Sequence, residues 1–318
     1  MKEIKIPKIL SHNTIGEVLQ QREILLQIEE CKPSDEIIFD LSENESVSIL
    51  GILLIAELSD FLREERKCNC FVRTKKGSLQ LYFPRIMGLI KRDRPNQEIE
   101  NYLNEIRVPI QRCHNDKESL DAVNRLIPII RRELNLPEPL LKALNWALWE
   151  LVANAGLHGY RMYGKGEFDY PKPVYFCAFD YKDFIDMAIL DVGCGIHASF
   201  LKSGKDKYKN ISNAEALTSA IKESETGDPG GSTGFGLYGC AEIARKAKGK
   251  LVIISGTDKL IVSEQGEKLL SSGNFSGTMV LLSIPQKSAI DLAEILGKDN
   301  ITVVSSLDDL IGGVDAGG

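Results

Sequence analysis

The sequence predicts an α/β protein, with an α+β second half, built from two units. Short strand-like apolar runs alternate with amphipathic helical segments, and a charged stretch with two prolines separates the two halves. The 318 residues are about twice the roughly 150 residues typical of one domain. We therefore divide the chain into a first α/β unit at 1–90, a linker at 91–116, a second unit at 117–286 and a tail at 287–318.

The first unit alternates strands and helices along the chain. Strands are expected at 3–9, 36–42 and 68–74, and helices at 14–31 and 48–67. The helix at 14–31 carries its apolar residues near one face. The longest apolar run, 47–58, is interrupted by Ser, Gly and Glu, and it is shorter than the roughly 18 residues that a membrane span needs.

The second unit begins with helices and continues with strands. Helices are expected at 117–136, with a kink at Pro128, and at 137–160, where a proline stands near the start. Strands are expected at 173–181, 184–193, 250–256 and 277–285, with a helix at 236–249. The polar stretch 197–233 predicts a long loop. The linker should contain a short helix near 97–105, and the tail a short helix followed by a strand-like segment at 301–306.

Composition excludes several classes of protein. A net charge of −6 disfavours a nucleic-acid partner or an anionic membrane. The first ten residues lack a long apolar core, so we expect no secretory signal. Seven scattered cysteines indicate reduced thiols and a cytoplasmic protein, and the pair Cys68 and Cys70 lacks the further ligands of a zinc site.

A polar stripe crosses the otherwise apolar helix at 137–160. Glu150, Asn154 and His158 are four residues apart, and since each residue turns a helix by about 100°, the three lie along one line. The alternative interpretation is a solvated face that ends at Gly159.

A second motif, LDVGCGI, follows the strand at 184–193. The strand delivers Asp191 at its end, and Gly193 and Gly195 leave room for close approach to the backbone. A carboxylate at the end of a buried strand needs a donor, and the exocyclic amine of a purine is one. The alternative is an ordinary strand-to-loop turn.

A third motif is a Gly-rich segment that runs into a helix at Gly236 and Leu237. Gly234 and Gly236 allow the backbone to approach a ligand, and the N–H groups at a helix start favour a polyphosphate. The alternative is a mobile surface loop. Four lysines before it, at 202, 205, 207 and 209, either reach phosphates or form a solvated surface.

The three motifs in this order, with GTMVLLSIP after them, resemble the ATP-binding domain of the GHKL superfamily, which includes DNA gyrase, heat-shock chaperones and histidine kinases. The segment LPEPLLKALNWALWELVANAGLHG most resembles the anti-sigma-factor serine kinases. The resemblance covers about 117–286 and implies a two-layer Bergerat-type ATP-binding sandwich.

The resemblance also implies roles for individual residues. Asn154 would bind Mg²⁺ through its side-chain oxygen, and Glu150 would orient or deprotonate the nucleophile at the γ-phosphate. Asp191 would accept from adenine, with Thr278 supporting that side. The remaining nucleotide-binding positions implied by the motifs are His158, which has a minor role, Gly193, Gly195, Gly234, Gly236 and Leu237.

Residues 34–90 resemble STAS domains, the fold of anti-anti-sigma factors. Those domains usually carry a phosphate-accepting Ser just before a helical Gly, whereas here Ile49 and Leu50 precede Gly51 and Ser48 is one turn earlier. A docking or regulatory module is the alternative.

These observations predict a cytoplasmic, Mg²⁺-dependent ATP-binding protein that hydrolyses ATP or transfers phosphate to a protein partner. The alternative is a non-catalytic ATP-gated switch that uses the STAS-like unit for docking. We expect no membrane and no direct nucleic-acid partner. Homodimer formation is left open.

Overall fold

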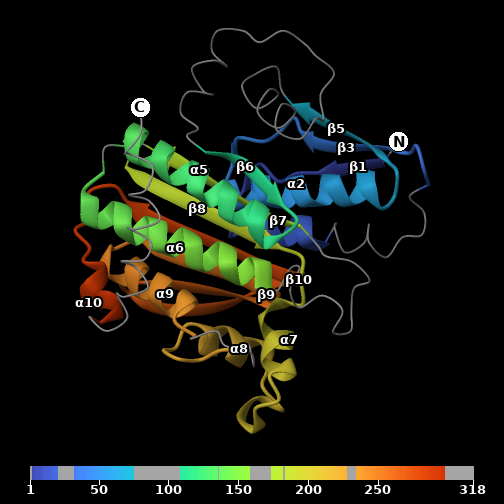
Figure 1. The fold of residues 1–318 in the computed structure, drawn as a ribbon. Helices are drawn as coiled ribbons and strands as arrows, with labels where there is room; N and C mark the ends of the chain where they lie inside the picture. The colour runs from blue at the N-terminus through green and yellow to red at the C-terminus, as the bar shows by residue number, and fades with distance from the viewer. Residues whose placement is uncertain are drawn as a thin grey trace.

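The computed structural model describes residues 2–20, 32–74, 108–134, 136–157, 173–181, 183–227 and 234–297. The protein is a mixed α/β structure with two main sheets (Figure 1). The expected helix near 97–105, the strand-like 301–306 and His158 lie outside the described residues.

The N-terminal sheet is parallel and has three strands. Its order is β1 (Lys2–Lys5), β3 (Glu36–Leu41) and β5 (Asn69–Thr74), which confirms the strands expected at 36–42 and 68–74. The strand expected at 3–9 is instead two, β1 and β2 (Ile9–Leu10), and β2 pairs with β4 (Ser46–Val47). Pro7 lies at the break and cannot donate a ladder hydrogen bond. Residues 15–20 are helical, as expected.

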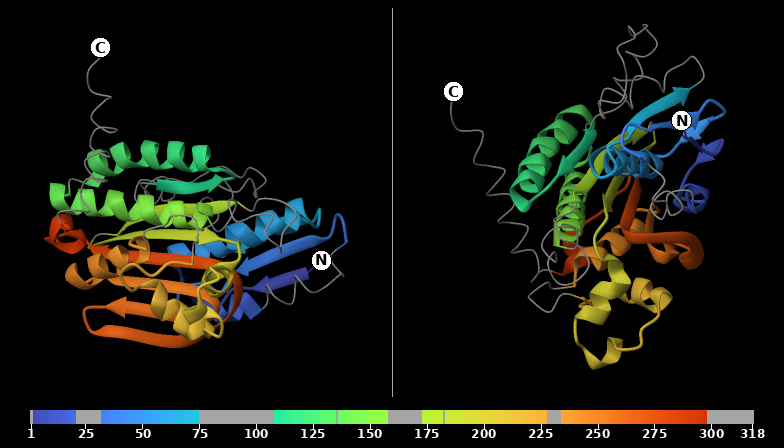
Figure 2. Two further views of the ribbon diagram at one scale, coloured as in Figure 1. Left: turned by 60° about the horizontal axis from the view of Figure 1, so that its bottom comes forward. Right: turned by 90° about the vertical axis from the view of Figure 1, so that its right-hand side faces the viewer.

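Helix α2 (Ile49–Glu64) lies between the two sheets (Figure 2). Ser48 caps its start by accepting a hydrogen bond from the Gly51 N–H at 3.2 Å. The helix is buried around nearly its whole circumference, and its first two turns are apolar, as expected for a helix packed on several sides. Gly51 leaves room for Leu10, whose Cγ would be 2.5 Å from an added Cβ.

The C-terminal sheet has five strands, and every neighbouring pair is antiparallel. Its order is β6 (Val108–Cys113), β7 (Val174–Tyr181), β8 (Phe184–Asp191), β10 (Gly266–Pro285) and β9 (Lys250–Ser263). Helices α5 (Asp116–Leu134), α6 (Glu138–Gly156) and α9 (Gly236–Lys246) cover one face (Figure 1). α5 continues through Pro128.

Strand alternation divides the apolar residues of this sheet between two cores. In β8, Ile185, Met187 and Ile189 pack in a helix-side core with α5, α6 and α9. Ala188 and Leu190 belong to an α2-side core, which also contains residues of β1, β3 and α2. The two units are therefore joined through α2 by one continuous apolar core.

Three segments differ from the sequence prediction. Residues 108–113, expected in the linker, form edge strand β6, because pairing with β7 outweighs their polar character. Residues 257–276, expected as a connection, extend β9 and β10 into a long hairpin. The expected loop at 197–233 contains α7 (Gly195–Lys202), a 3₁₀ turn (Asp206–Tyr208) and α8 (Asn213–Ala220), because its few apolar side chains enter the helix-side core.

The tail begins with α10 (Leu292–Leu296), the short helix expected there. No helix among the described residues has both the length and the apolar character that crossing a bilayer requires. The cysteines in the described ranges are free thiols.

Candidate functional site

A row of four register partners, three of them polar, crosses one end of the C-terminal sheet. Val174 on β7 pairs with Asp191 on β8, which pairs with Thr278 on β10, which pairs with Ser255 on β9. Asp191 has the same strand parity as Met187 and Ile189, and Thr278 the same parity as Val280 and Leu282, so both side chains face the helix-covered side. Two of the sequence-predicted site residues, Asp191 and Thr278, are therefore direct neighbours.

Asp191 is a buried acceptor at the end of its strand. It is 2% exposed, and its Oδ1 accepts the Gly193 N–H at 2.9 Å. Burial raises the pKa of its carboxyl group to about 7, against the smaller lowering effect of the Gly193 and Thr278 donors. The Thr278 hydroxyl lies against this carboxylate without a hydrogen bond of good geometry. Asp191 thus has acceptor capacity for a further donor.

The loop after Asp191 is pressed closely against β10. Gly195 has a φ of +73°, and an added Cβ would lie 2.6 Å from the Ser276 carbonyl oxygen. An added Cβ at Gly277 would lie 1.9 Å from the Asp191 carbonyl oxygen. Glycine at both positions is therefore required for this contact.

Ser255 fastens the same loop, and the sequence motifs did not include it. Its Oγ accepts the Ile196 N–H at 3.0 Å and donates to the Gly277 carbonyl at 2.8 Å. Ser255 joins three separate segments of the site. The available signal was a Ser-Gly pair directly after the apolar run at 251–254.

The first and third motifs meet at the start of α9. An added Cβ at Gly236 would lie 2.6 Å from Asn154 Nδ2 and 2.7 Å from Glu150 Oε2. Glu150 and Asn154 are half-buried, and burial raises the pKa of the Glu150 carboxyl group. No hydrogen bond or ion pair to Glu150 is formed within the described ranges. The first turn of α9 therefore lies directly against the polar stripe of α6.

The start of α9 leaves backbone donors available. Its N-cap is Phe235, which makes no side-chain capping hydrogen bond, so the first N–H groups lack this partner. Gly234 has a φ of +72°, and an added Cβ would lie 2.7 Å from the Ser224 carbonyl carbon. Leu237 packs partly buried against the helix-side core and anchors this turn.

The α6–α9 contact also defines which end of the sheet the stripe occupies. The two helices are antiparallel, since Gly236 contacts residues 150 and 154 while Gly239 contacts Trp146. α6 packs on β8, and its C-terminal end lies at the sheet end where α7 begins (Figure 1). The stripe of α6 and the row of Asp191 and Thr278 therefore lie at the same end of the helix-covered face.

The segment between the second and third motifs is attached to the sheet. Asn213 Nδ2 at the start of α8 donates to the Ser255 carbonyl at 3.0 Å and to Asp258 Oδ2 at 2.7 Å. The lysines at 205, 207 and 209 have partners of their own, namely the Thr226 carbonyl, Glu225 and Asp206. These partners favour the surface interpretation for the three lysines.

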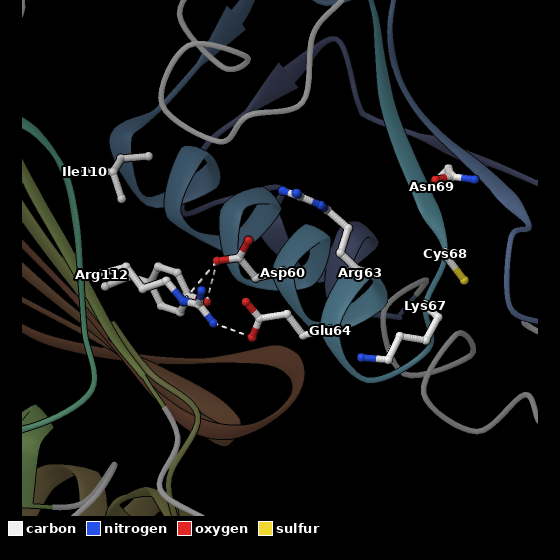
Figure 3. A pocket seen from close by; sticks show the side chains of 9 residues that line it. Asp60, Arg63, Glu64, Lys67, Cys68, Asn69, Ile110 and Arg112 are labelled. Atoms are coloured by element: carbon white, nitrogen blue, oxygen red, sulfur yellow. Dashed lines mark hydrogen bonds and ion pairs between the residues drawn. The ribbon is translucent and has the colours of Figure 1, made fainter.

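A second polar cluster, which the sequence did not reveal, lies between α2 and the C-terminal sheet (Figure 3). It borders a cavity of about 570 Å³. The Tyr175 hydroxyl donates to Asp60 Oδ2 at 2.9 Å, and Arg112 Nε lies 3.2 Å from the same oxygen. Arg112 also pairs with Glu64. Burial raises the pKa of Asp60, which Arg112 and Tyr175 lower.

Metal-binding capacity is limited in the residues that the structure describes. They contain no cluster of three or more His, Cys, Asp or Glu side chains able to hold an ion by themselves. Asn154 and Glu150 can offer oxygen atoms only as part of a site completed by a ligand.

No protein-family model matches the sequence, and no curated protein is significantly similar to it.

Proposed function

We propose that the chain binds an adenine nucleotide with Mg²⁺ at the end of the C-terminal sheet and hydrolyses ATP or transfers its phosphate to a protein partner. The observation that carries the proposal is the contact of Gly236 with Glu150 and Asn154, at the same sheet end as the buried Asp191 and Thr278. Three motifs separated by about 40 residues each thus contribute to one location.

The purine end of the proposed site is at Asp191. A carboxylate that is 2% exposed and has no cationic partner among the described residues favours a ligand that brings a donor. The adenine amine supplies such a donor, and binding it would stabilise the ionised form of Asp191. Gly193 donates its N–H to Asp191, and Gly195 keeps the following loop close against β10, beside the position that we propose for the base.

The phosphate end is at the first turn of α9. Its N–H groups lack a side-chain cap and fit a phosphate group, and the absence of a Cβ at Gly236 lets Asn154 and Glu150 lie at the same turn. Asn154 would hold Mg²⁺ through its amide oxygen, and the ion would neutralise phosphate charge. Glu150, one turn earlier, is placed to accept a proton from the attacking hydroxyl or water, and its raised pKa makes it a better base.

The purine and phosphate ends support the Bergerat-type assignment that we propose for the second unit. For the first unit, which we propose to be STAS-like, the observations are a parallel three-stranded sheet and the helix α2 packed on it. In the first unit, Ser48 serves as the helix N-cap and α2 is buried against the chain's own sheet. Both features favour a regulatory or docking module over a phosphate acceptor.

The first test is a titration of ATP with and without Mg²⁺ on wild type, Asp191→Asn and Asp186→Asn. Asp186 lies at the opposite end of β8 and serves as the matched control. We expect Asp191→Asn to weaken ATP binding at least tenfold, as for loss of a charged acceptor, and Asp186→Asn to leave it unchanged. Equal affinity in all three proteins, or no binding by wild type, would rule the site out.

The second test separates an enzyme from an ATP-gated switch. Glu150→Gln should bind ATP as wild type does but lose hydrolysis or radiolabel transfer to lysate proteins. Glu138→Gln, in the exposed first turn of the same helix, should retain both. Wild type that binds MgATP without hydrolysis or transfer would identify the chain as a switch.

A further inference from the structure

Lys259 is a buried cation that has no anionic partner among the described residues. Its side chain is 4% exposed, although it lies on the long β9–β10 hairpin. The ammonium group donates to the His12 carbonyl oxygen at 2.7 Å, and this is its single hydrogen bond within the described ranges. An ammonium group has three donors, so two remain without an acceptor there.

Among the described residues, the charged group that acts on the pKa of Lys259 is another lysine. Burial lowers its pKa, and the nearby Lys268 lowers it further. The pKa of His12 is lowered to about 4 by burial and by Lys250 and Lys259, so its ring is neutral at pH 7. Glu17 borders the same pocket but forms no ion pair with Lys259. Burying a charge without a counter-charge is costly, so an anion would be stabilised here.

The pocket beside Lys259 can hold a small ligand. It has a volume of about 490 Å³ and lies between residues 12–20 and the hairpin segment 271–274. Its lining includes the polar side chains of Asn13, Gln20, Ser271, Ser272 and Asn274. Gly16 and Gly273 bring the two walls together, since an added Cβ at Gly16 would lie 2.7 Å from the Ser272 carbonyl oxygen.

The cavity beside Arg112 shows why charge alone does not make such a site. There the guanidinium group of Arg112 forms ion pairs with Asp60 and Glu64 (Figure 3). The Tyr175 hydroxyl also donates a hydrogen bond to Asp60. Among the residues that the structure describes, no carboxylate pairs with Lys259 in this way. We propose that the Lys259 pocket binds a small oxyanion, either inorganic phosphate or the phosphate or carboxylate group of a metabolite, with Lys259 as the charge partner.

The test compares wild type, Lys259→Met and Lys246→Met by thermal unfolding and calorimetry in inorganic phosphate, in acetate, and in chloride of equal ionic strength. Met is close to Lys in length and neutral, and Lys246, in the last turn of α9, does not line the pocket. We expect wild type and Lys246→Met to be stabilised by phosphate or acetate beyond chloride. Lys259→Met should bind the anion at least tenfold more weakly, and it should be more stable than wild type in chloride. A response to phosphate alone would identify phosphate as the recognised group.

Two results would overturn the proposal. One is an equal response to the anions in wild type and Lys259→Met. The other comes from an NMR titration of wild type, which does not depend on the variant folding. Here the proposal fails if the amide resonances of Gly16 and Gly273 show no saturable shift in about 20 mM phosphate or acetate, a concentration that saturates a site with a millimolar dissociation constant. Glu17→Gln should change the anion affinity in the opposite direction to Lys259→Met, since removing the negative charge of Glu17 should tighten anion binding. MgATP binding by Lys259→Met, measured in parallel, should be unchanged, which separates this site from the proposed nucleotide site.

Discussion

Gly236→Ala tests whether the α6–α9 contact is the functional centre. The added methyl group would lie 2.6 Å from Asn154 Nδ2 and 2.7 Å from Glu150 Oε2, where ordinary contact begins at 3.4 Å. The Glu150 carboxylate must therefore move by about 3.4 − 2.7 = 0.7 Å, and the Asn154 amide by slightly more. Both groups end flexible side chains, so they can move without disturbing the core.

The expected effects on folding and function are different in size. Ala is favoured over Gly in a helix by up to about 1 kcal/mol, which offsets the displacement of the two side chains, so the change in unfolding free energy should be small. A misplacement approaching 1 Å of groups that position the metal or the nucleophile costs on the order of 10–100-fold in rate. Gly236→Ala should therefore fold normally and lose most MgATP turnover.

Gly239→Ala, one turn later in α9, is the comparison for folding. Its added methyl group would lie 2.2 Å from Trp146 Cη2, a rigid ring atom in the core, so the unfolding free energy should fall by about 1–3 kcal/mol. Urea unfolding and a coupled ATPase assay on both variants measure the two effects. Wild-type affinity and turnover in a folded Gly236→Ala protein would refute the assignment of Glu150 and Asn154 to the site.

Three further predictions concern stability. The Asp191 pKa is raised from 3.8 to about 7 in the folded protein, so the free energy of unfolding falls by up to about 4 kcal/mol as the pH rises from about 4 to about 7. Asp191→Asn should remove this loss. In urea unfolding, the variant should therefore be more stable than wild type at about pH 8 but not at about pH 5. Leu54→Ala, in the α2-side core, should lower the free energy of unfolding by about 2–4 kcal/mol, and the protein should still unfold in one calorimetric transition. A second transition at the wild-type temperature would contradict a core shared by the two units. Arg112→Met should raise the Asp60 pKa further, so its destabilisation should be larger at about pH 8 than at about pH 5; an equal loss at both values would exclude a charge effect.

The spacing of apolar residues predicted the helices and strands whose own sequence determines their secondary structure. Helix α2 and strand β3 follow directly from apolar patterns at 48–67 and 36–42. Strand β6 was missed because it contains Pro109 and polar residues, and its form depends on β7, more than 60 residues later. The outer parts of β9 and β10 were missed because one side of the hairpin is polar and exposed, as at 264–268.

The same distinction applies to the candidate site: residues that stand out in their own segment were predicted, and those that depend on distant partners were not. Asp191 and Glu150 were predicted because a carboxylate within an apolar strand or helix is conspicuous in sequence. Ser255 could not be predicted in the same way, since its role arises from contacts with Ile196 and Gly277 on two other segments. Lys259 was equally inconspicuous, because a lysine in a polar segment normally extends into solvent, whereas in the folded chain it is buried and bonds to the His12 carbonyl.

The two faces of β7 and β8 connect the candidate site with the first unit. Val174 and Asp191 form one register pair of the row that faces α6, while Tyr175 and Leu190, the next pair, face α2. Tyr175 is tied to α2 through Asp60. Because the pairs are adjacent along paired strands, we expect a shift of α2 across the sheet to disturb the strand end that carries Asp191. We therefore predict that a partner that displaces the first unit changes the candidate site through these two strands, without contacting the nucleotide side of the sheet.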